Sequence, residues 1–191
     1  MAATRYVFPG YVWHAAICLA LMAALPMAYV RLRGRPFRNY LLAAGNLRLG
    51  LKYSAILLAA AVPVMLYGSA LPEFKGYYPL WRPASDNLVY FAYYEAYMLA
   101  VMVATEVFYR GFLLNTLLQD TRWGNWIHAL VYMLAHVGKP PVEVVYSLPV
   151  GWVFGRVDTK CGSILPSLAM HYLSSLIFDL LVMYHGGFRL I

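Results

Sequence analysis

Long apolar runs separated by short polar stretches occupy most of the chain. A helix needs about 20 apolar residues to cross a bilayer, and several of these runs reach that length. In chain order the runs cover residues 11–30, 53–71, 88–118, 125–137, 142–154 and 163–184. The pattern predicts an all-α fold, a polytopic membrane helix bundle of about six transmembrane helices in a single membrane domain over residues 1–191. Two of these helices lie within residues 1–71.

The third run differs from the others in length and in charge. At about 31 residues it is too long for one upright span. It also carries three charged side chains, Glu95, Glu106 and Arg110. We expect this segment to tilt strongly, to protrude from the membrane, or to break near Arg110-Gly111.

Composition excludes an ordinary soluble domain. Hydrophobic residues make up 62% of the chain and charged residues 12%, with a mean hydropathy of +0.60. Soluble domains are roughly half apolar and a quarter charged. We therefore expect an integral, multi-pass protein of the cell (cytoplasmic) membrane. The net charge of +7 does not indicate nucleic-acid binding, because basic residues in such chains set the membrane orientation.

The distribution of Lys and Arg predicts that orientation. In a six-helix arrangement nine of the 15 basic residues fall on one side, five on the other, and Arg110 within the membrane. The nine are Arg31, Arg33, Arg35, Arg38, Arg48, Lys52, Arg122, Arg156 and Lys160. By the positive-inside rule this side faces the cytoplasm, and both ends of the chain lie outside it.

Charged side chains inside the membrane are costly, about 2.5–3.5 kcal/mol each on insertion scales, unless they face the bundle interior. Glu106 and Arg110 are four residues apart, so they share a helical face and can pair. Glu95 lies eleven residues before Glu106 and returns to within roughly 20° of that face. A structural role explains these residues as well as a functional site does. Glu106 and Arg110 would then form an ion pair that locks the bundle, and Glu95 would be a structural hydrogen-bonding group.

Two histidines, His136 and His171, lie on separate apolar segments of a chain that also places a glutamate and an arginine within the membrane. A glutamate and two histidines in a dry cavity can polarise a water molecule and stabilise an oxyanion. The same residue types can also bind zinc. However, no H-E-x-x-H motif places two ligands on one helix. The remaining three histidines, His14, His128 and His185, are interpreted as buried hydrogen-bond donors.

Four motifs in register resemble those of one protein family. The stretch 105–114, TEVFYRGFLL, resembles the E-E-x-x-x-R-G-F-L-L signature of the CPBP (Abi) family of CAAX proteases and bacteriocin-processing membrane proteins. The stretch 132–136, YMLAH, resembles the family's F-x-x-x-H motif, and residues 151–166 resemble G-x-x-x-G followed by T-G-S-I-x-P. The stretch 171–175, HYLSS, resembles the closing H-x-x-x-N. Together these motifs mark residues 90–179 as a CPBP-like catalytic core.

This resemblance implies a helix bundle around a polar cavity and a glutamate-dependent intramembrane endopeptidase. In its CAAX branch the family trims the C-terminal tripeptide from prenylated proteins. The implied partners are a membrane-anchored protein or peptide substrate and the lipid bilayer, with no cofactor or metal ion. Carried over by motif, the site consists of Glu106, Arg110, His136, His171 and Ser175. Glu106 and His136 would activate water, and His171 with Ser175 would stabilise the oxyanion.

The sequence departs from the family pattern at two of these positions. Thr105 replaces the first glutamate of the pair, and Ser175 replaces the asparagine. Glu106 could act as the base with Arg110 tuning it, or Glu95 could supply the missing carboxylate. Alternatively, the protein binds a peptide without cutting it, as bacteriocin immunity proteins do. A zinc peptidase and a small-solute transporter are further alternatives, the latter without the inverted repeat that many transporters carry.

Overall fold

The computed structural model describes residues 8–187, which are mostly helical, with no strand among them. In chain order the elements are α1 (Phe8–Cys18), η2 (Leu19–Ala24), α2 (Leu25–Leu32), η3 (Phe37–Tyr40), α3 (Leu47–Ala70), α4 (Pro72–Tyr77), η4 (Arg82–Ser85), α5 (Leu88–Glu106), η5 (Val107–Leu113), α6 (Leu114–Asp120), α7 (Gly124–Leu134), α8 (Pro141–Cys161) and α9 (Leu165–His185). The all-α prediction is confirmed.

Four helical segments of the described chain are long and apolar enough to cross a membrane. They are Gly10–Leu32, Leu47–Ala70, Leu88–Asp120 and Leu165–His185. Helix α7 has 11 residues, so at 1.5 Å per residue it covers about half of a 30 Å hydrocarbon layer. The chain is an integral membrane protein with a polytopic bundle, whereas the number of six transmembrane helices stays a prediction.

The long third run does not break at Arg110-Gly111. It continues from α5 through η5 into α6, and η5 is a π-helical segment with a wider turn. The side-chain amide of Asn115 donates to the carbonyl oxygens of Arg110 and Gly111, at 2.7 and 2.8 Å. A side chain of α6 therefore satisfies backbone acceptors of the widened turn, and the helix passes through it intact.

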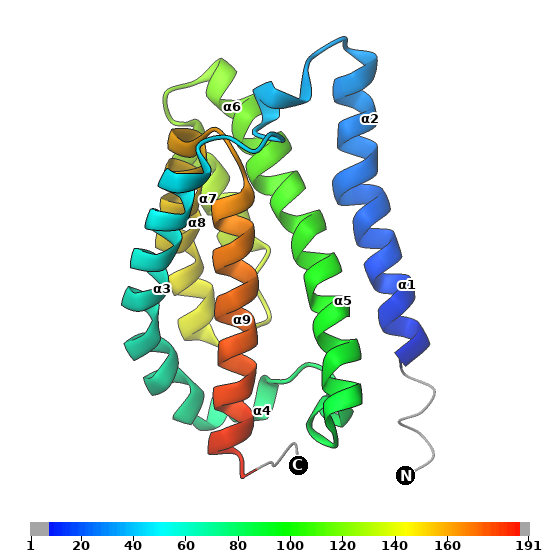
Figure 1. The fold of residues 1–191 in the computed structure, drawn as a ribbon, viewed down its shortest axis with the longest axis vertical. Helices are drawn as coiled ribbons and strands as arrows, with labels where there is room; N and C mark the ends of the chain where they lie inside the picture. Colours follow the sequence, from blue (N-terminus) through cyan, green and yellow to red (C-terminus); the bar gives the residue numbers. More distant parts are fainter. Residues whose placement is uncertain (1–7, 188–191) are drawn as a thin grey trace.

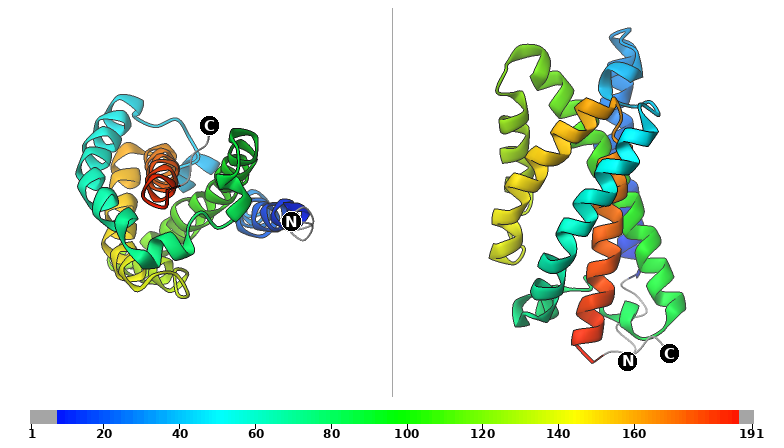
Figure 2. Two further views of the ribbon diagram at one scale, coloured as in Figure 1. Left: turned by 90° about the horizontal axis from the view of Figure 1, so that it is seen from below. Right: turned by 60° about the vertical axis from the view of Figure 1, so that its left-hand side comes forward.

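Helix α9 runs through the middle of the bundle, with α3, α5 and α8 around it (Figure 2). The rod formed by α1, η2 and α2 stands at the outer side and packs mainly against α5 (Figure 1). Helices α7 and α8 form a hairpin whose connecting loop lies part-way along the bundle, short of the end that α3, α5 and α9 reach (Figures 1 and 2). Residues 135–140 are therefore placed well inside the length of the bundle.

Two glycines allow α7 and α8 to pack closely. A Cβ atom at Gly151 would lie 2.9 Å from Cδ1 of Tyr132, and one at Gly155 would collide with Oδ1 of Asn125. The amide of Asn125 also donates to the carbonyl oxygen of Trp152 at 3.0 Å. Small residues four positions apart thus bring two helix backbones together, as they do in many membrane helix pairs.

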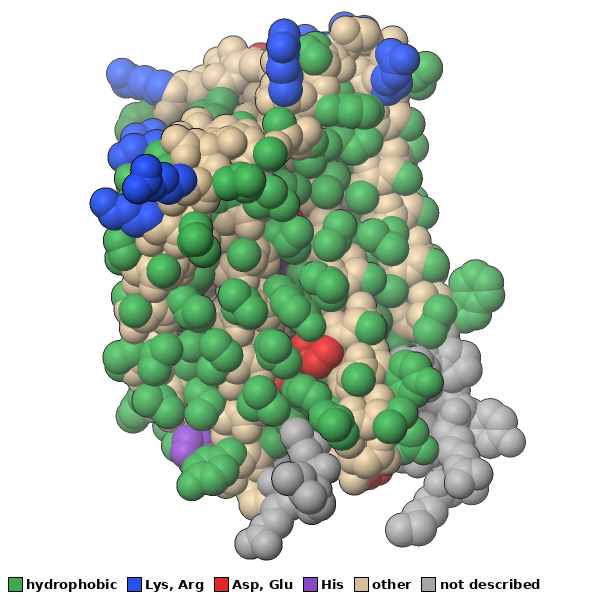
Figure 3. All heavy atoms as spheres, viewed as in Figure 1, with side chains coloured by type: hydrophobic (Ala, Val, Ile, Leu, Met, Phe, Trp, Pro, Cys, Tyr) green, Lys and Arg blue, Asp and Glu red, His purple; other side chains and the backbone are tan. Residues whose placement is uncertain are grey.

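The basic residues mark one end of the bundle. The connections α2–α3, α6–α7 and α8–α9 all lie at the same end (Figure 1), and Lys and Arg side chains gather there, while apolar side chains cover the flank (Figure 3). The start of α1 and the end of α9 lie at the opposite end (Figure 1). This arrangement agrees with the predicted division of basic residues between two sides, and the cytoplasmic orientation stays a prediction.

Candidate active site

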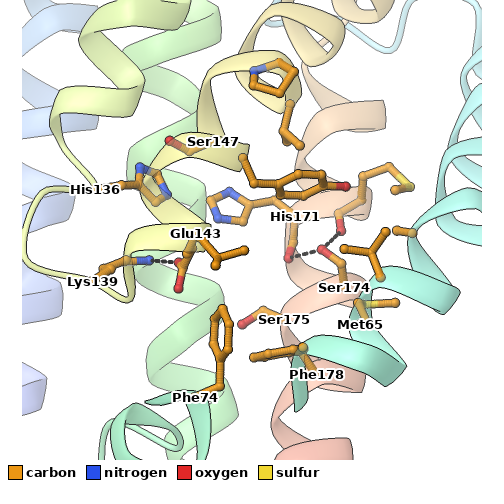
Figure 4. Close-up of a pocket in the computed structure, with 18 of the residues that line it drawn as sticks. Met65, Phe74, His136, Lys139, Glu143, Ser147, His171, Ser174, Ser175 and Phe178 are labelled. Carbon is orange, nitrogen blue, oxygen red and sulfur yellow. Dashed lines mark hydrogen bonds and ion pairs between the residues drawn. The ribbon is translucent and has the colours of Figure 1, made fainter. Parts of the chain in front are cut away.

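A cavity of about 440 Å³ opens between the α7–α8 hairpin, α3, α4, α5 and α9. Its wall is mostly apolar, with a few polar side chains that converge on it (Figure 4). The histidine, lysine, glutamate and serine residues of the wall are His136, Lys139, Glu143, Ser147, His171, Ser174 and Ser175. An apolar cavity with a few polar groups is typical of a ligand or substrate site.

Helix α9 directs two side chains at one buried carboxylate. Ser167 and His171 are one turn apart on α9, and each contacts Glu106 of α5 at 2.7 Å: Ser167 Oγ donates to Oε2 and His171 Nδ1 to Oε1. The Glu106 side chain is 0% exposed and does not line the cavity. Because an ionised carboxylate only accepts, Nδ1 of His171 carries the hydrogen, and its Nε2 is the nitrogen left for the cavity.

Arg110 balances the charge of this carboxylate. Its Nη1 atom lies 3.2 Å from Oε1 of Glu106, and both side chains are fully buried. The guanidinium also stacks over the ring of Tyr132 at 3.9 Å and lies 5.4 Å from the ring of Phe154. The predicted pairing of Glu106 with Arg110 is therefore present, and a cation–π contact ties it to α7.

The turn between α8 and α9 sets the register of Ser167 and His171. Gly162 has a φ of 69°, a left-handed conformation that ends α8 and suits glycine. The backbone N–H of Ser167 donates to Oδ1 of Asp158 at 3.1 Å, and that of Leu165 donates to Oγ of Ser163 at 3.2 Å. Side chains thus cap the first turn of α9 and fix its rotation toward Glu106.

His136 reaches the same cavity from the α7–α8 connection. Its Nδ1 lies 2.8 Å from the carbonyl oxygen of Tyr132, and the two rings lie 4.5 Å apart. A carbonyl can only accept, so Nδ1 carries the hydrogen and Nε2 is free to accept one. The Tyr132 ring also lies 6.3 Å from that of His171, and both imidazoles extend into the cavity (Figure 4).

The other predicted site residues divide into two groups. Ser175 lines the cavity one turn beyond His171 on α9. Glu95 is 6% exposed and does not line the cavity. Thr105 does not line it either, and its hydroxyl donates to the carbonyl oxygen of Val101 at 2.8 Å. The structure therefore brings His136, His171 and Ser175 together at the cavity, with Glu106 directly behind His171.

The three remaining histidines lie away from the cavity. His14 is exposed rather than buried and lies 3.1 Å from the hydroxyl of Tyr97, so its interpretation as a buried donor is wrong. His128 is fully buried, and His185 contacts Ser69 at 3.0 Å.

A cluster at the cavity wall was missed in the sequence. The hydroxyl of Tyr78 donates to the Glu143 carboxylate at 2.8 and 2.9 Å, and Nζ of Lys139 donates to its Oε1 at 2.7 Å. Burial and the Glu143 charge raise the pKa of Tyr78 well above its usual range, so the phenol stays a donor. A Lys and a Glu four residues apart, on either side of Pro140-Pro141, were the available signal.

Within residues 8–187 there is no group of three or more His, Cys, Asp or Glu side chains that could hold a metal ion. Glu106, His136 and His171 therefore do not form a ligand set of the kind that structural or catalytic zinc requires. Their arrangement fits proton transfer and hydrogen bonding.

Comparison with known families matches residues 87–177 to a family model described as "Type II CAAX prenyl endopeptidase Rce1-like". No curated protein and no solved structure matches the chain. The matched segment runs from the start of α5 into α9 and contains Glu106, His136, Glu143 and His171. Residues 87–177 are thus similar to the Rce1-like type II CAAX prenyl endopeptidases, in agreement with the resemblance to the CPBP family.

Proposed function

We propose that the protein is an intramembrane endopeptidase that cleaves a membrane-anchored peptide with a water molecule activated by histidine and glutamate. The family match supports a membrane protease. The observation that carries the finer proposal is that His136 and His171, from separate elements, line one largely apolar cavity, with Glu106 hydrogen-bonded to the far side of His171.

The geometry supports a division of roles. Nε2 of His136 can accept a hydrogen bond from the attacking water and so orient its oxygen toward the scissile carbonyl carbon. Protonated His171 can donate through Nε2 to the oxyanion, and the Glu106 carboxylate balances its charge. The hydroxyl of Ser175 is a second donor from the same wall. Glu106 therefore acts through His171, as the aspartate of a catalytic triad acts through its histidine.

Cleavage of a membrane-tethered reporter library by purified protein in lipid tests this proposal. We expect cleavage by the wild type and a loss of about 100-fold or more in His136→Ala, because the water loses its acceptor. His14→Ala is the matched control, since His14 lies on α1 outside the cavity. A His136→Ala variant that cleaves like the wild type would contradict the proposal.

One observation favours a second function, peptide binding without cleavage. Thr105 brings no carboxylate, and its hydroxyl is bonded to the backbone of its own helix. Position 105 lies one turn beyond Met102 on the stripe of α5 that carries the cavity residues Met98 and Met102. If the wild type binds but does not cut and Thr105→Glu cuts, the native protein is a binder of the immunity type on an intact protease scaffold.

A further inference from the structure

The cavity wall contains a single acidic side chain among the described residues, and it is Glu143. Four other acidic residues are buried elsewhere, between 0% and 6% exposed: Glu95, Glu106, Asp158 and Asp179. The side chain of Glu143 is 20% exposed, against 0% for Glu106. A carboxylate that takes part in hydrolysis must touch water, and Glu143 meets that requirement.

Glu143 is also held in a fixed position. It lies in the first turn of α8, and Lys139 holds it from the α7–α8 connection at 2.7 Å. Tyr78 holds it from the segment after α4, at 2.8 and 2.9 Å, and the Tyr78 hydroxyl lies 3.4 Å from Nζ of Lys139. Two elements far apart in sequence thus orient one carboxylate at the cavity, and Figure 4 shows the contact with Lys139. A functional group held by such a shell of partners is pre-organised for its task.

The carboxylate retains capacity to accept a further hydrogen. Its two oxygens offer about four lone-pair sites. Lys139 and Tyr78 both donate to Oε1, whereas Oε2 accepts from Tyr78. His136 lines the same cavity, and Figure 4 shows its imidazole on the side where Lys139 and Glu143 meet. A water hydrogen-bonded to Nε2 of His136 can therefore direct its second hydrogen at Glu143.

We infer that Glu143 is a further catalytic residue of this cavity, the carboxylate that carries a proton from the attacking water to the leaving nitrogen. This inference rests on the proposed endopeptidase function. The water oxygen bonds to the scissile carbonyl carbon while one water proton moves to Glu143. The C–N bond then breaks, and the same proton passes from Glu143 to the leaving amine. The products are a free carboxyl group and a free amino group, and Glu143 is ionised again.

Lys139 and Tyr78 are positioning residues in this scheme. The Lys139 ammonium lies 2.7 Å from Oε1 of Glu143 and holds the carboxylate in place for proton transfer. Tyr78 fixes the direction of the carboxylate. Loss of Lys139 therefore lowers kcat for cleavage with KM and thermal stability unchanged, whereas loss of a purely structural ion pair lowers thermal stability together with the rate.

The experiment compares Glu143→Gln, Tyr78→Phe and Lys139→Met for reporter cleavage and thermal unfolding in lipid, with Glu73→Gln as the matched control. Glu73 is exposed on α4 and outside the cavity wall. We expect Glu143→Gln to lose about 100-fold or more of the cleavage rate while it stays folded. Tyr78→Phe and Lys139→Met each lose a few-fold of kcat with KM unchanged.

Two outcomes overturn the inference and leave the proposed function standing. One is a Glu143→Gln variant that cleaves at the wild-type rate. The other is an equal loss of rate and of thermal stability in Glu143→Gln and Tyr78→Phe, because then the cluster is a structural bridge. A wild type that cleaves no reporter contradicts the proposed function itself, and this inference falls with it.

Discussion

Glu106 and Glu143 occupy similar local arrangements in two different regions. Each is four residues from a cation, Arg110 or Lys139, and each accepts a hydrogen bond from a hydroxyl on another element. Their surroundings differ, since the Glu106 pair is 0% exposed and the Glu143 pair is 20–29% exposed. Arginine, with its planar and weakly hydrated guanidinium, suits the buried pair, whereas lysine suits the pair that meets water.

This contrast teaches that an ion pair of given spacing has no fixed role. Where water is excluded, the pair holds α5 to α9 through Ser167 and His171. Where the cavity reaches it, the carboxylate is available for proton transfer. The following variants test the contrast, from the largest expected effect to the smallest.

Glu106→Gln has the largest expected effect. The substitution leaves Arg110 buried without a counter-charge, which costs about 3–5 kcal/mol in other proteins. It also removes the charge that accepts from His171, so we expect both stability and cleavage to fall. Thermal unfolding and reporter cleavage measure the two losses. The double variant Glu106→Gln/Arg110→Met is expected to regain stability without activity, and a return of activity would contradict the role of Glu106 through His171.

Gly151→Ala tests whether the two regions are coupled through Tyr132. The ring of Tyr132 stacks on Arg110, and its carbonyl oxygen holds His136. The new Cβ would lie 2.9 Å from that ring, so α7 or the ring must shift. We expect a loss of about 1–3 kcal/mol of stability and of roughly tenfold or more in kcat/KM. Gly10→Ala, with open space around it, is the control; equal behaviour of the two variants would mean that Tyr132 does not couple them.

Lys139→Met is expected to change stability little, because partly exposed ion pairs contribute about 0–1 kcal/mol. Its effect is on kcat for cleavage instead, which we expect to fall a few-fold. Lys52→Met, at an exposed position of α3, controls for loss of a positive charge. A stability loss in Lys139→Met as large as that of Glu106→Gln would show that the two pairs are energetically alike and would break the comparison.

Treatment with a chelator has the smallest expected effect, which is none. The described residues contain no group of three metal-binding side chains. Cleavage by chelator-washed protein, measured beside its metal content, should equal that of untreated protein. A loss that zinc restores would contradict the metal-free mechanism and would require the histidines to be ligands.

Part of this site could be predicted from sequence because it depends on local geometry. The fold class and the pairing of Glu106 with Arg110 follow from apolar run length and from helical spacing, both properties of consecutive residues. The motif resemblance also located His136, His171 and Ser175, which the structure brings to one cavity. Their catalytic roles remain predictions.

Other features depend on contacts between distant segments. Spacing predicts that Glu95 and Glu106 lie on one stripe of α5, yet neither lines the cavity. Glu106 is covered by Ser167 and His171 of α9. Glu143 carries no sequence signal beyond a neighbouring lysine, because its contact with Tyr78 exists only in the tertiary structure.

The sequence by itself determined that this chain is a bundle of membrane helices and that its second half resembles the CPBP family, because hydrophobicity, helical period and motif order are properties of the chain itself. Only the tertiary structure decided that the Glu106 carboxylate is buried and that the Glu143 carboxylate lines the cavity. That choice depends on how α9, the α7–α8 hairpin and the segment after α4 pack against α5, and packing between residues more than 60 positions apart leaves no periodic signal in the sequence.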